Sequence, residues 1–170
     1  MEKTKRAQKA AQGAGLEAVA ILKADHENVQ QLFKEYEELA EQQAAPKERE
    51  ALAAMICAEL TIHTKIEEEI FYPAIREVLG DEEMLSEAIV EHSSAKDLIA
   101  QLADMSAEDE FFDAKVKVLG EQIEHHVEEE QGEMFPKVQA SKLDTVELGR
   151  RLFLRRQELV DELDIPLVAP

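Results

Sequence analysis

The sequence predicts an all-α fold, an up-down-up-down antiparallel four-helix bundle with an additional short C-terminal helix. Hydrophobic residues recur at helical spacing, no segment shows the two-residue alternation of a half-buried strand, and only 6 Gly and 5 Pro interrupt the 170 residues. A chain of this length can bury the core of one domain. We expect a flexible leader over 1–14, the bundle over 15–140, and the C-terminal helix and tail over 141–170.

The first two helices are predicted at 15–41 and 46–72. Pro46 suits the first turn of the second helix, because its missing N–H would have no partner there. We expect Pro73 to end or kink that helix before a short continuation to about Leu79. One face of each helix is continuous: Leu22, His26, Val29, Phe33 and Tyr36 in the first, and Ile56, Leu60, His63, Glu67 and Ile70 in the second.

The third and fourth helices are predicted at 82–104 and 107–135, and a last amphipathic helix at 144–162. A Gly-Asp pair before residue 82 supplies a helix stop and an N-cap. Ser106, with Asp109 three residues on, resembles a capping box. Gly132, inside the fourth helix, indicates a bulge, an access point for a small molecule, or plain tolerance of glycine near a helix end. The inward faces carry Leu85, Ile89, His92, Ile99 and Leu102, then Val116, Leu119, Ile123, His126 and Glu130, and finally Leu148, Leu152, Leu159 and Leu163.

The charge balance excludes several classes of partner. The 19 Lys and Arg against 38 Asp and Glu give a net charge of −19. Because a surface this negative repels phosphate backbones and anionic headgroups, we expect neither nucleic acid nor a membrane as partner.

Cys57 is the only cysteine, which excludes an intramolecular disulfide and an all-Cys metal site. The apolar run at 16–22 is too short for a signal peptide or membrane span, which favours a cytoplasmic protein.

An internal repeat organises the chain into two helical hairpins. The stretch LTIHTKIEEEIFYP at 60–73 aligns without a gap on IEHHVEEEQGEMFP at 123–136. Each hairpin therefore supplies one histidine from its first helix and an H-x-x-x-E motif from its second. The matched residues are His63 with His126, Glu67 with Glu130 and, in the preceding helices, Asp25-His26 with Glu91-His92.

These residue types at this spacing predict a metal site. Positions i and i+4 lie one turn apart on one helix face, so the His and Glu of each motif can reach a common ion. A buried ionised carboxylate is costly unless another charge compensates it, and a metal supplies that charge. Imidazole and carboxylate without thiolate suit iron, manganese or zinc, and two carboxylates shared among four imidazoles suit a pair of ions better than one tetrahedral zinc. The candidate ligands are His26, His63, Glu67, His92, His126 and Glu130.

At these residues the sequence resembles the hemerythrin-like, or HHE cation-binding, family over about residues 16–140, and the last helix looks like one in bacterial members. The resemblance implies two non-haem iron ions with an oxo or hydroxo bridge, with Glu67 and Glu130 bridging the irons, and a small diatomic or peroxide ligand. It implies no particular protein partner. The motifs are DHENVQQLF around His26, EH at 91–92, and H-x-x-x-E-x-x-x-x-x-P at 63–73 and 126–136.

Two positions depart from the oxygen-carrying pattern. Lys96 stands where that pattern has the second His of H-x-x-x-H, and Glu130 stands where it usually has Asp. The missing histidine argues against reversible oxygen carriage and favours turnover with peroxide or nitric oxide, or a sensing role. Whether the chain is an enzyme stays open. Lys96 either donates to a bound oxygen species or points to solvent, and solvent is favoured because lysine is rarely buried.

Two other functions compete with this one. A ferritin-like di-iron oxidase or iron-handling protein needs Glu-x-x-His pairs, and no histidine here has Glu three residues before it. An acidic helical interaction module without metal would leave Glu67 and Glu130 buried without a partner.

Several residues near the candidate ligands have two interpretations each. His125 is adjacent to a ligand but about a hundred degrees around the helix, so we expect it at the surface or behind the ligands. Glu27 and Glu129 are candidate partners for ligand imidazoles. Tyr36 and Tyr72 either pack in the core or donate a hydrogen bond inside the metal pocket.

Overall fold

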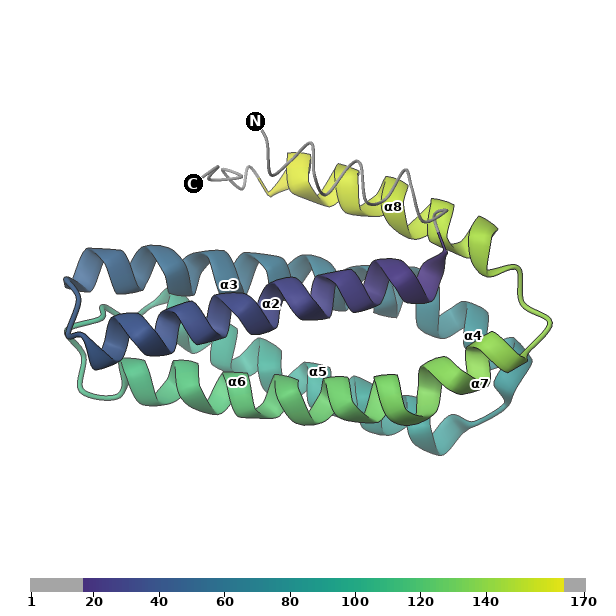
Figure 1. Cartoon of the computed structure of the whole chain (residues 1–170), viewed down its shortest axis with the longest axis horizontal. Helices are drawn as coiled ribbons and strands as arrows, with labels where there is room; N and C mark the ends of the chain where they lie inside the picture. The colour runs from purple at the N-terminus through teal and green to yellow at the C-terminus, as the bar shows by residue number, and fades with distance from the viewer. Residues whose placement is uncertain (1–16, 164–170) are drawn as a thin grey trace.

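The computed structural model describes residues 17–163, which are helical apart from short turns. Its long helices are α2 (Ala18–Glu41), α3 (Pro46–Ile66), α5 (Glu82–Ala103) and α6 (Phe112–Glu129), and they lie side by side (Figure 1). The prediction of an all-helical bundle is confirmed for this part of the chain. The leader predicted for 1–14 lies outside the described residues, as does the end of the tail.

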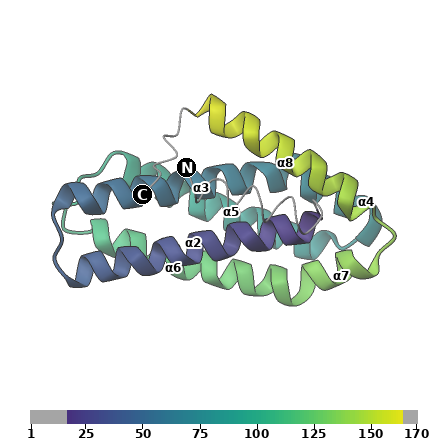
Figure 2. The ribbon, with the colours of Figure 1, turned by 45° about the horizontal axis from the view of Figure 1, so that its top comes forward.

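The long helices enclose one interior. α2 packs on α3 and α6, and α5 packs on the same two helices. α8 (Thr145–Glu162) lies across α2 and α3 on the outside of the bundle, as Figures 1 and 2 show from two angles. No helix within residues 17–163 is long and apolar enough to cross a membrane.

The turn between α4 (Tyr72–Leu79) and α5 follows the predicted capping chemistry. Gly80 adopts a left-handed φ of 62° after the last turn of α4, a conformation that glycine enters without steric cost. The Asp81 side chain then accepts a hydrogen bond from the backbone N–H of Met84 at 3.2 Å, which caps α5.

The predicted start of the fourth helix was wrong by five residues. The reciprocal contact expected of a capping box is half present, since Asp109 accepts from the Ser106 N–H at 2.8 Å. The helix nevertheless begins at Phe112. Glu50, from α3, accepts from the Ala107 N–H and from the Ser106 hydroxyl, and these bonds hold the segment as a turn. That long-range contact had no signal in the local pattern.

In the second and fourth predicted helices, a π-helical turn comes just before Pro73 and Pro136, and the helix continues past each proline. These turns are η1 (Glu67–Phe71), which leads into α4, and η2 (Glu130–Met134), which leads into α7 (Phe135–Ala140). Proline lacks the N–H that would bond the carbonyl four residues earlier, and its ring crowds that carbonyl. A wider turn relieves both problems, and π-turns of this kind are frequent at functional sites. Gly132 lies in η2, so its interpretation as part of a helix bulge is confirmed.

Two hydrophobic clusters fill the interior, one on each side of a polar layer. The expectation that Ile89 faces inward was wrong, because Ala88 and Ala95 take the inner positions of α5 and leave Ile89 40% exposed. Leu163 is likewise exposed. One cluster includes Leu22, Ile66, Phe71, Phe135, Leu152 and Leu159, and the other includes Val29, Leu60, Ala95, Phe112, Leu119 and Ile123.

Candidate metal centre

The six predicted ligands come together in the polar layer between the two clusters. Each of the helices α2, α3, α5 and α6 carries one of the four histidines, and the two glutamates are the first residues of η1 and η2. All six side chains are buried, and Glu67 has no exposed surface at all. The residues brought together are His26, His63, Glu67, His92, His126 and Glu130.

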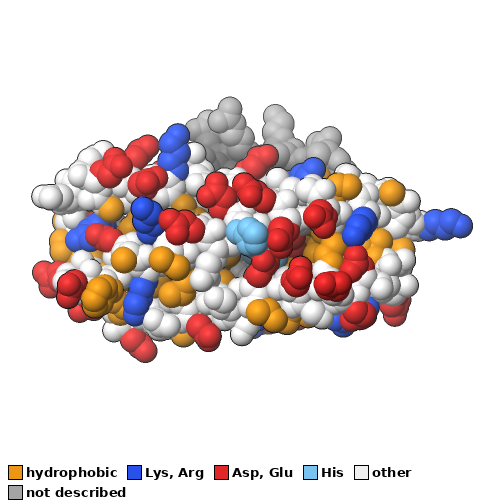
Figure 3. Space-filling view, turned by 90° about the horizontal axis from the view of Figure 1, so that it is seen from below, with side chains coloured by type: hydrophobic (Ala, Val, Ile, Leu, Met, Phe, Trp, Pro, Cys, Tyr) orange, Lys and Arg blue, Asp and Glu red, His pale blue; other side chains and the backbone are white. Residues whose placement is uncertain are grey.

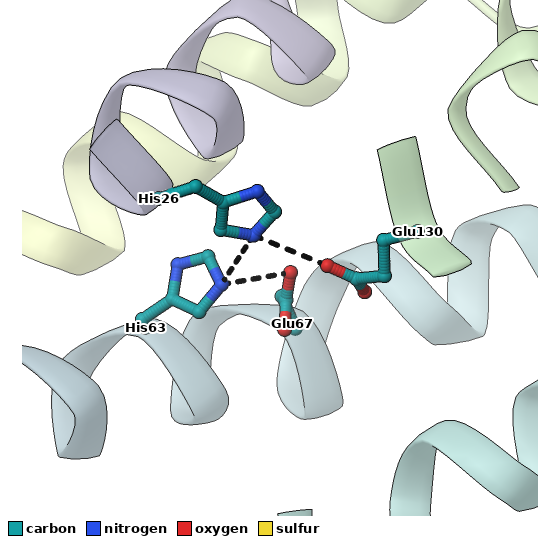
Figure 4. Close-up of side chains that lie close together, drawn as sticks. All are labelled: His26, His63, Glu67 and Glu130. Carbon is teal, nitrogen blue, oxygen red and sulfur yellow. Dashed lines mark hydrogen bonds and ion pairs between the residues drawn. The ribbon is translucent and has the colours of Figure 1, made fainter. Parts of the chain in front are cut away.

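His26 and His63 form one imidazole pair (Figure 4). Their Nε2 atoms lie 3.1 Å apart. Glu67 Oε1 lies 3.1 Å from the Nε2 of His63, and Glu130 Oε2 lies 3.2 Å from the Nε2 of His26. Two imidazoles and two carboxylates therefore face one small volume.

His92 and His126 form the second pair around the other oxygens of the same two carboxylates. Their Nε2 atoms are also 3.1 Å apart. Glu67 Oε2 lies 3.1 Å from the Nε2 of His92, and Glu130 Oε1 lies 3.5 Å from the Nε2 of His126. Each carboxylate thus presents one oxygen to each imidazole pair, which is the arrangement of a group that bridges two ions.

Every imidazole is held from behind by an oxygen acceptor at Nδ1. This contact assigns the ring proton to Nδ1 and leaves the Nε2 lone pair pointing inward, the tautomer that binds metal through Nε2. The supporting acceptors are Gln131 for His26 and Glu68 for His92, both at 3.0 Å, Asp25 for His63 at 3.3 Å, and Glu91 for His126.

The inner faces of these groups are almost all acceptors. Among residues 17–163, these four Nε2 atoms and four carboxylate oxygens meet a single hydroxyl donor, that of Tyr72, which donates to Glu130 Oε1 at 2.7 Å. In the same part of the chain, Glu67 Oε1 and Glu130 Oε2 have no hydrogen-bond partner. Buried acceptors without donors are costly, so the set requires protons or cations between its members. The donor set fits a metal site.

The pKa values show how strongly the cluster attracts positive charge. Burial lowers the pKa of His63, but the charge of Glu67 and the contacts of the two ring nitrogens with the carboxylates of Asp25 and Glu67 outweigh it and raise the pKa well above the usual value. The same balance, with Glu130 as the main partner, raises the pKa of His126 to about 10. Burial raises the pKa of Glu67, but the neighbouring imidazoles bring it well below the usual range. The two carboxylates therefore favour a positive charge between the imidazoles, whether it is a proton or a metal ion.

The predicted partners Glu27 and Glu129 do not support any ligand imidazole. The acceptors that do are each adjacent in sequence to a ligand, and the repeat relates them in pairs. Asp25 precedes His26 in sequence but accepts from His63, on the other helix of its hairpin. In the same way, Glu91 precedes His92 but accepts from His126. The repeat already paired Asp25 with Glu91, so a signal for these two was present in the sequence.

The C-terminal helix also reaches this support. Arg156 on α8 places its guanidinium Nε 3.4 Å from Asp25 Oδ1 and donates to Glu59 at 2.8 Å. Burial raises the pKa of Asp25, but the hydrogen bond to His63 and the charge of Arg156 bring it below its usual value. α8 therefore helps keep ionised the carboxylate that orients His63.

The remaining candidate residues separate clearly. Tyr72 contacts the carboxylates of both Glu67 and Glu130, whereas Tyr36 donates to Asp113 at 2.6 Å, away from the cluster. Lys96 donates to Glu68 at 2.6 Å from the surface, and this agrees with the solvent interpretation. His125 is at the surface, with 65% of its side chain exposed.

The chain is similar to a known protein family, to a characterised protein and to a solved structure. A stretch of 115 residues is 29% identical to the DNA nickase of Nostoc sp. (strain PCC 7120 / SAG 25.82 / UTEX 2576) and covers 68% of this chain but only 31% of that protein. The crystal structure of a hemerythrin HHE cation binding domain-containing protein from Mycobacterium kansasii shares the fold, with a TM-score of 0.71 at 23% identity over 88% of this chain and 93% of that one. The model of the Hemerythrin HHE cation binding domain family matches residues 17–138. The chain belongs to the hemerythrin HHE cation-binding domain family.

Proposed function

We propose that this protein binds two non-haem iron ions in the core of an up-down-up-down four-helix bundle and uses them to react with a small molecule, namely oxygen, peroxide or nitric oxide. One observation carries the proposal: two fully buried carboxylates each turn one oxygen to each of two imidazole pairs, and only one hydroxyl donates to the whole set. A metal-free interaction module would have to keep these groups buried with protons alone.

The ligand set divides naturally between two ions. His26 and His63 would hold the first with one oxygen from each glutamate, and His92 and His126 would hold the second with the other oxygens. These bonds number eight against the roughly twelve positions of two octahedral ions, which leaves positions for small molecules. Iron bound there supplies one-electron chemistry.

The surrounding side chains keep the site rigid and dry. The ring of Phe135 stacks on His26 with centroids 5.7 Å apart and planes 8° from parallel, and Phe71 packs against the edge of Phe135. Both phenylalanines are fully buried, so they exclude water from this side of the centre. Tyr72 holds its proton at Glu130 Oε1, where it is the one donor available to the interior.

Turnover or sensing fits these residues better than reversible oxygen carriage. The position that carries a further imidazole in oxygen carriers is Lys96, and its ammonium pairs with Glu68 at the surface. The His92 side of the centre therefore has one protein ligand fewer. We expect the reduced protein to be oxidised rapidly and irreversibly by oxygen, as followed by absorption in a stopped-flow instrument. A stable adduct that reverses under vacuum would overturn this branch and restore the carrier interpretation.

The described residues support neither the ferritin-like oxidase nor binding to nucleic acid or membranes. A ferritin-like oxidase requires Glu-x-x-His pairs, which the ligand helices lack. The Nostoc relative bears the name of a DNA nickase, but this chain spans about a third of its length. With a net charge of −19, we propose that this chain does not bind a phosphate backbone, and that it binds no membrane.

Metal analysis tests the proposal directly. Protein purified after expression in iron-supplemented medium is expected to contain about two irons per chain and to show near-ultraviolet charge-transfer absorption. Glu67→Ala removes a proposed ligand of both ions, so this variant is expected to lose most of the iron and the absorption. The control Glu128→Ala removes an exposed carboxylate two residues before Glu130, and it is expected to keep both. One zinc per chain, unchanged by Glu67→Ala, would sink the proposal.

A further inference from the structure

A pocket of about 240 Å³ lies between the first half of α5 and the junction of α6 with η2. Seven of its eleven lining residues are Asp or Glu. In Figure 3 the lower face of the molecule shows acidic side chains gathered around a hollow with hydrophobic side chains in it. The pocket is therefore a concave, strongly negative surface, the shape that concentrates the electric field most.

The inner wall of the pocket belongs to the metal centre. His126 and Glu130 both line it, and only 3% and 1% of their surfaces are exposed. The pocket thus leads from solvent to two of the six candidate ligands, on the side of the second imidazole pair.

A second group of ligand-type side chains stands at the outer edge of this pocket. The Nε2 of His125 lies 3.2 Å from Glu129 Oε1 and 3.7 Å from Glu91 Oε1, and all three side chains can reach one ion. The other oxygen of Glu91 accepts from His126, so one carboxylate joins the outer group to a buried ligand. Burial and the like charges of Glu91 and Glu87 raise the pKa of Glu129, a sign that the carboxylates are crowded.

Three of the seven carboxylates in the pocket wall have no ion-pair partner among the described residues. Asp81 pairs with Lys137 at 2.9 Å, at the edge of the pocket. Within residues 17–163, Glu83, Glu87 and Glu133 form no ion pair with Lys or Arg. These three carboxylates are exposed, so they cost little to keep charged, and they attract cations rather than support the fold.

We propose that this pocket is the loading route by which divalent metal ions reach the centre, with Glu91, His125 and Glu129 as the first docking point. The proposal rests on the proposed function, because it assumes that the buried residues hold metal. The acidic wall raises the local concentration of divalent cations and repels anions. The docked ion is then one carboxylate away from His126.

The test follows the rate at which Fe²⁺ enters metal-free protein under anaerobic conditions, with unbound Fe²⁺ captured at timed intervals by a coloured chelator. The variant Glu83→Gln/Glu87→Gln/Glu133→Gln removes three charges and touches no candidate ligand. At low ionic strength its loading rate is expected to fall about tenfold, and the difference to shrink in high salt because the effect is screened. His125→Ala is expected to slow loading as well. Both variants should still reach two irons per chain.

The matched control removes three exposed carboxylates from the far end of α2, as Glu37→Gln/Glu38→Gln/Glu41→Gln, and is expected to load at the wild-type rate. Equal slowing of control and pocket variants would assign the effect to net charge and overturn the route. Unchanged rates in the pocket variants would overturn it too. Final iron content separates the two proposals: two irons with unchanged rates removes only the route, whereas a wild-type protein that takes up no iron removes both.

Discussion

Tyr72 and Phe135 occupy equivalent places in the two halves of the repeat, and they act differently. The Tyr72 hydroxyl points at the carboxylates of Glu67 and Glu130 and lies 3.2 Å from the Nε2 of His92. Phe135 has no hydroxyl and stacks on His26 instead. The two imidazole pairs are therefore chemically distinct although the repeat makes them look alike: one has a proton donor and the other has an apolar wall.

At the same scale, the acceptors behind the imidazoles should tune metal affinity. Asp25→Asn replaces a charged acceptor for the His63 Nδ1–H by a neutral one, so the ring becomes a weaker ligand. We expect iron affinity to fall roughly 10- to 100-fold, as measured by competition with a chelator of known affinity. Glu27→Gln removes an exposed carboxylate two residues along and should change nothing. A similar loss in both variants would mean that only overall charge matters.

That the six candidate ligands come together could be predicted from sequence, but half of the acceptors behind their imidazoles could not. Ligand positions follow from helical spacing within one helix, which the repeat displays twice. Asp25 and Glu91 were visible as matched neighbours of histidines, although their actual targets lie across the hairpin. Glu68 and Gln131 had no such signal, because the two residues differ in type between the halves of the repeat and because they lie within the π-turns, which the sequence did not predict.

At the scale of elements, each π-turn begins on a buried glutamate of the polar layer and ends just before a buried aromatic ring that lies next to that layer. The wider turn in η1 shifts every later side chain relative to an ideal α-helix, which brings Tyr72 onto the carboxylates. The prolines that follow make this geometry the favoured one. The sequence marked the prolines but not their effect, because a proline alone predicts a kink or an end as well.

Two glycines test these elements in opposite directions. Gly132 lies within η2 with open space where a Cβ would be, so Gly132→Ala should raise the free energy of unfolding by about 0.5–1 kcal/mol through the unfolded chain. Gly80 has a φ of 62°, where any Cβ is strained, so Gly80→Ala should lower it by about 1 kcal/mol. Urea denaturation measures both. A loss of stability in Gly132→Ala would show that the π-turn itself requires glycine.

At the scale of the whole molecule, a polar layer divides the hydrophobic core in two. The cluster that includes Val29 is built from all four long helices, and the cluster that includes Leu22 is built from α2, α3 and α5 with η1, α4, η2, α7 and α8. Together they fix the helices in register and hold the candidate ligands close together. The excess of acids is mostly on the surface, but two of the 38 lie in this layer. Stability therefore depends on what compensates those two charges.

This dependence predicts opposite pH responses for the metal-free and the iron-loaded protein. The folded pKa of His126, about 10, exceeds the usual 6.5, so its protonation stabilises the metal-free fold fully below pH 6.5 and is lost as the pH rises towards 10; His63 shifts in the same direction. The lowered pKa of Glu67 stabilises above about pH 4.5. The metal-free protein should therefore be most stable between pH 4.5 and 6.5.

Above that window, losing the extra proton of His126 should lower the free energy of unfolding by roughly 1 kcal/mol per pH unit, and the loss at His63 acts in the same direction. Between pH 6.5 and 9 the surface carboxylates stay charged and the lysines stay protonated, so the decline reports the buried layer. Iron requires deprotonated imidazoles and binds more tightly as the pH rises, so the loaded protein should not decline over this range. Urea denaturation of both forms at pH 6.5, 7.5 and 9 measures the difference. Metal-free protein that gains stability over these steps would show that protons do not hold its core together.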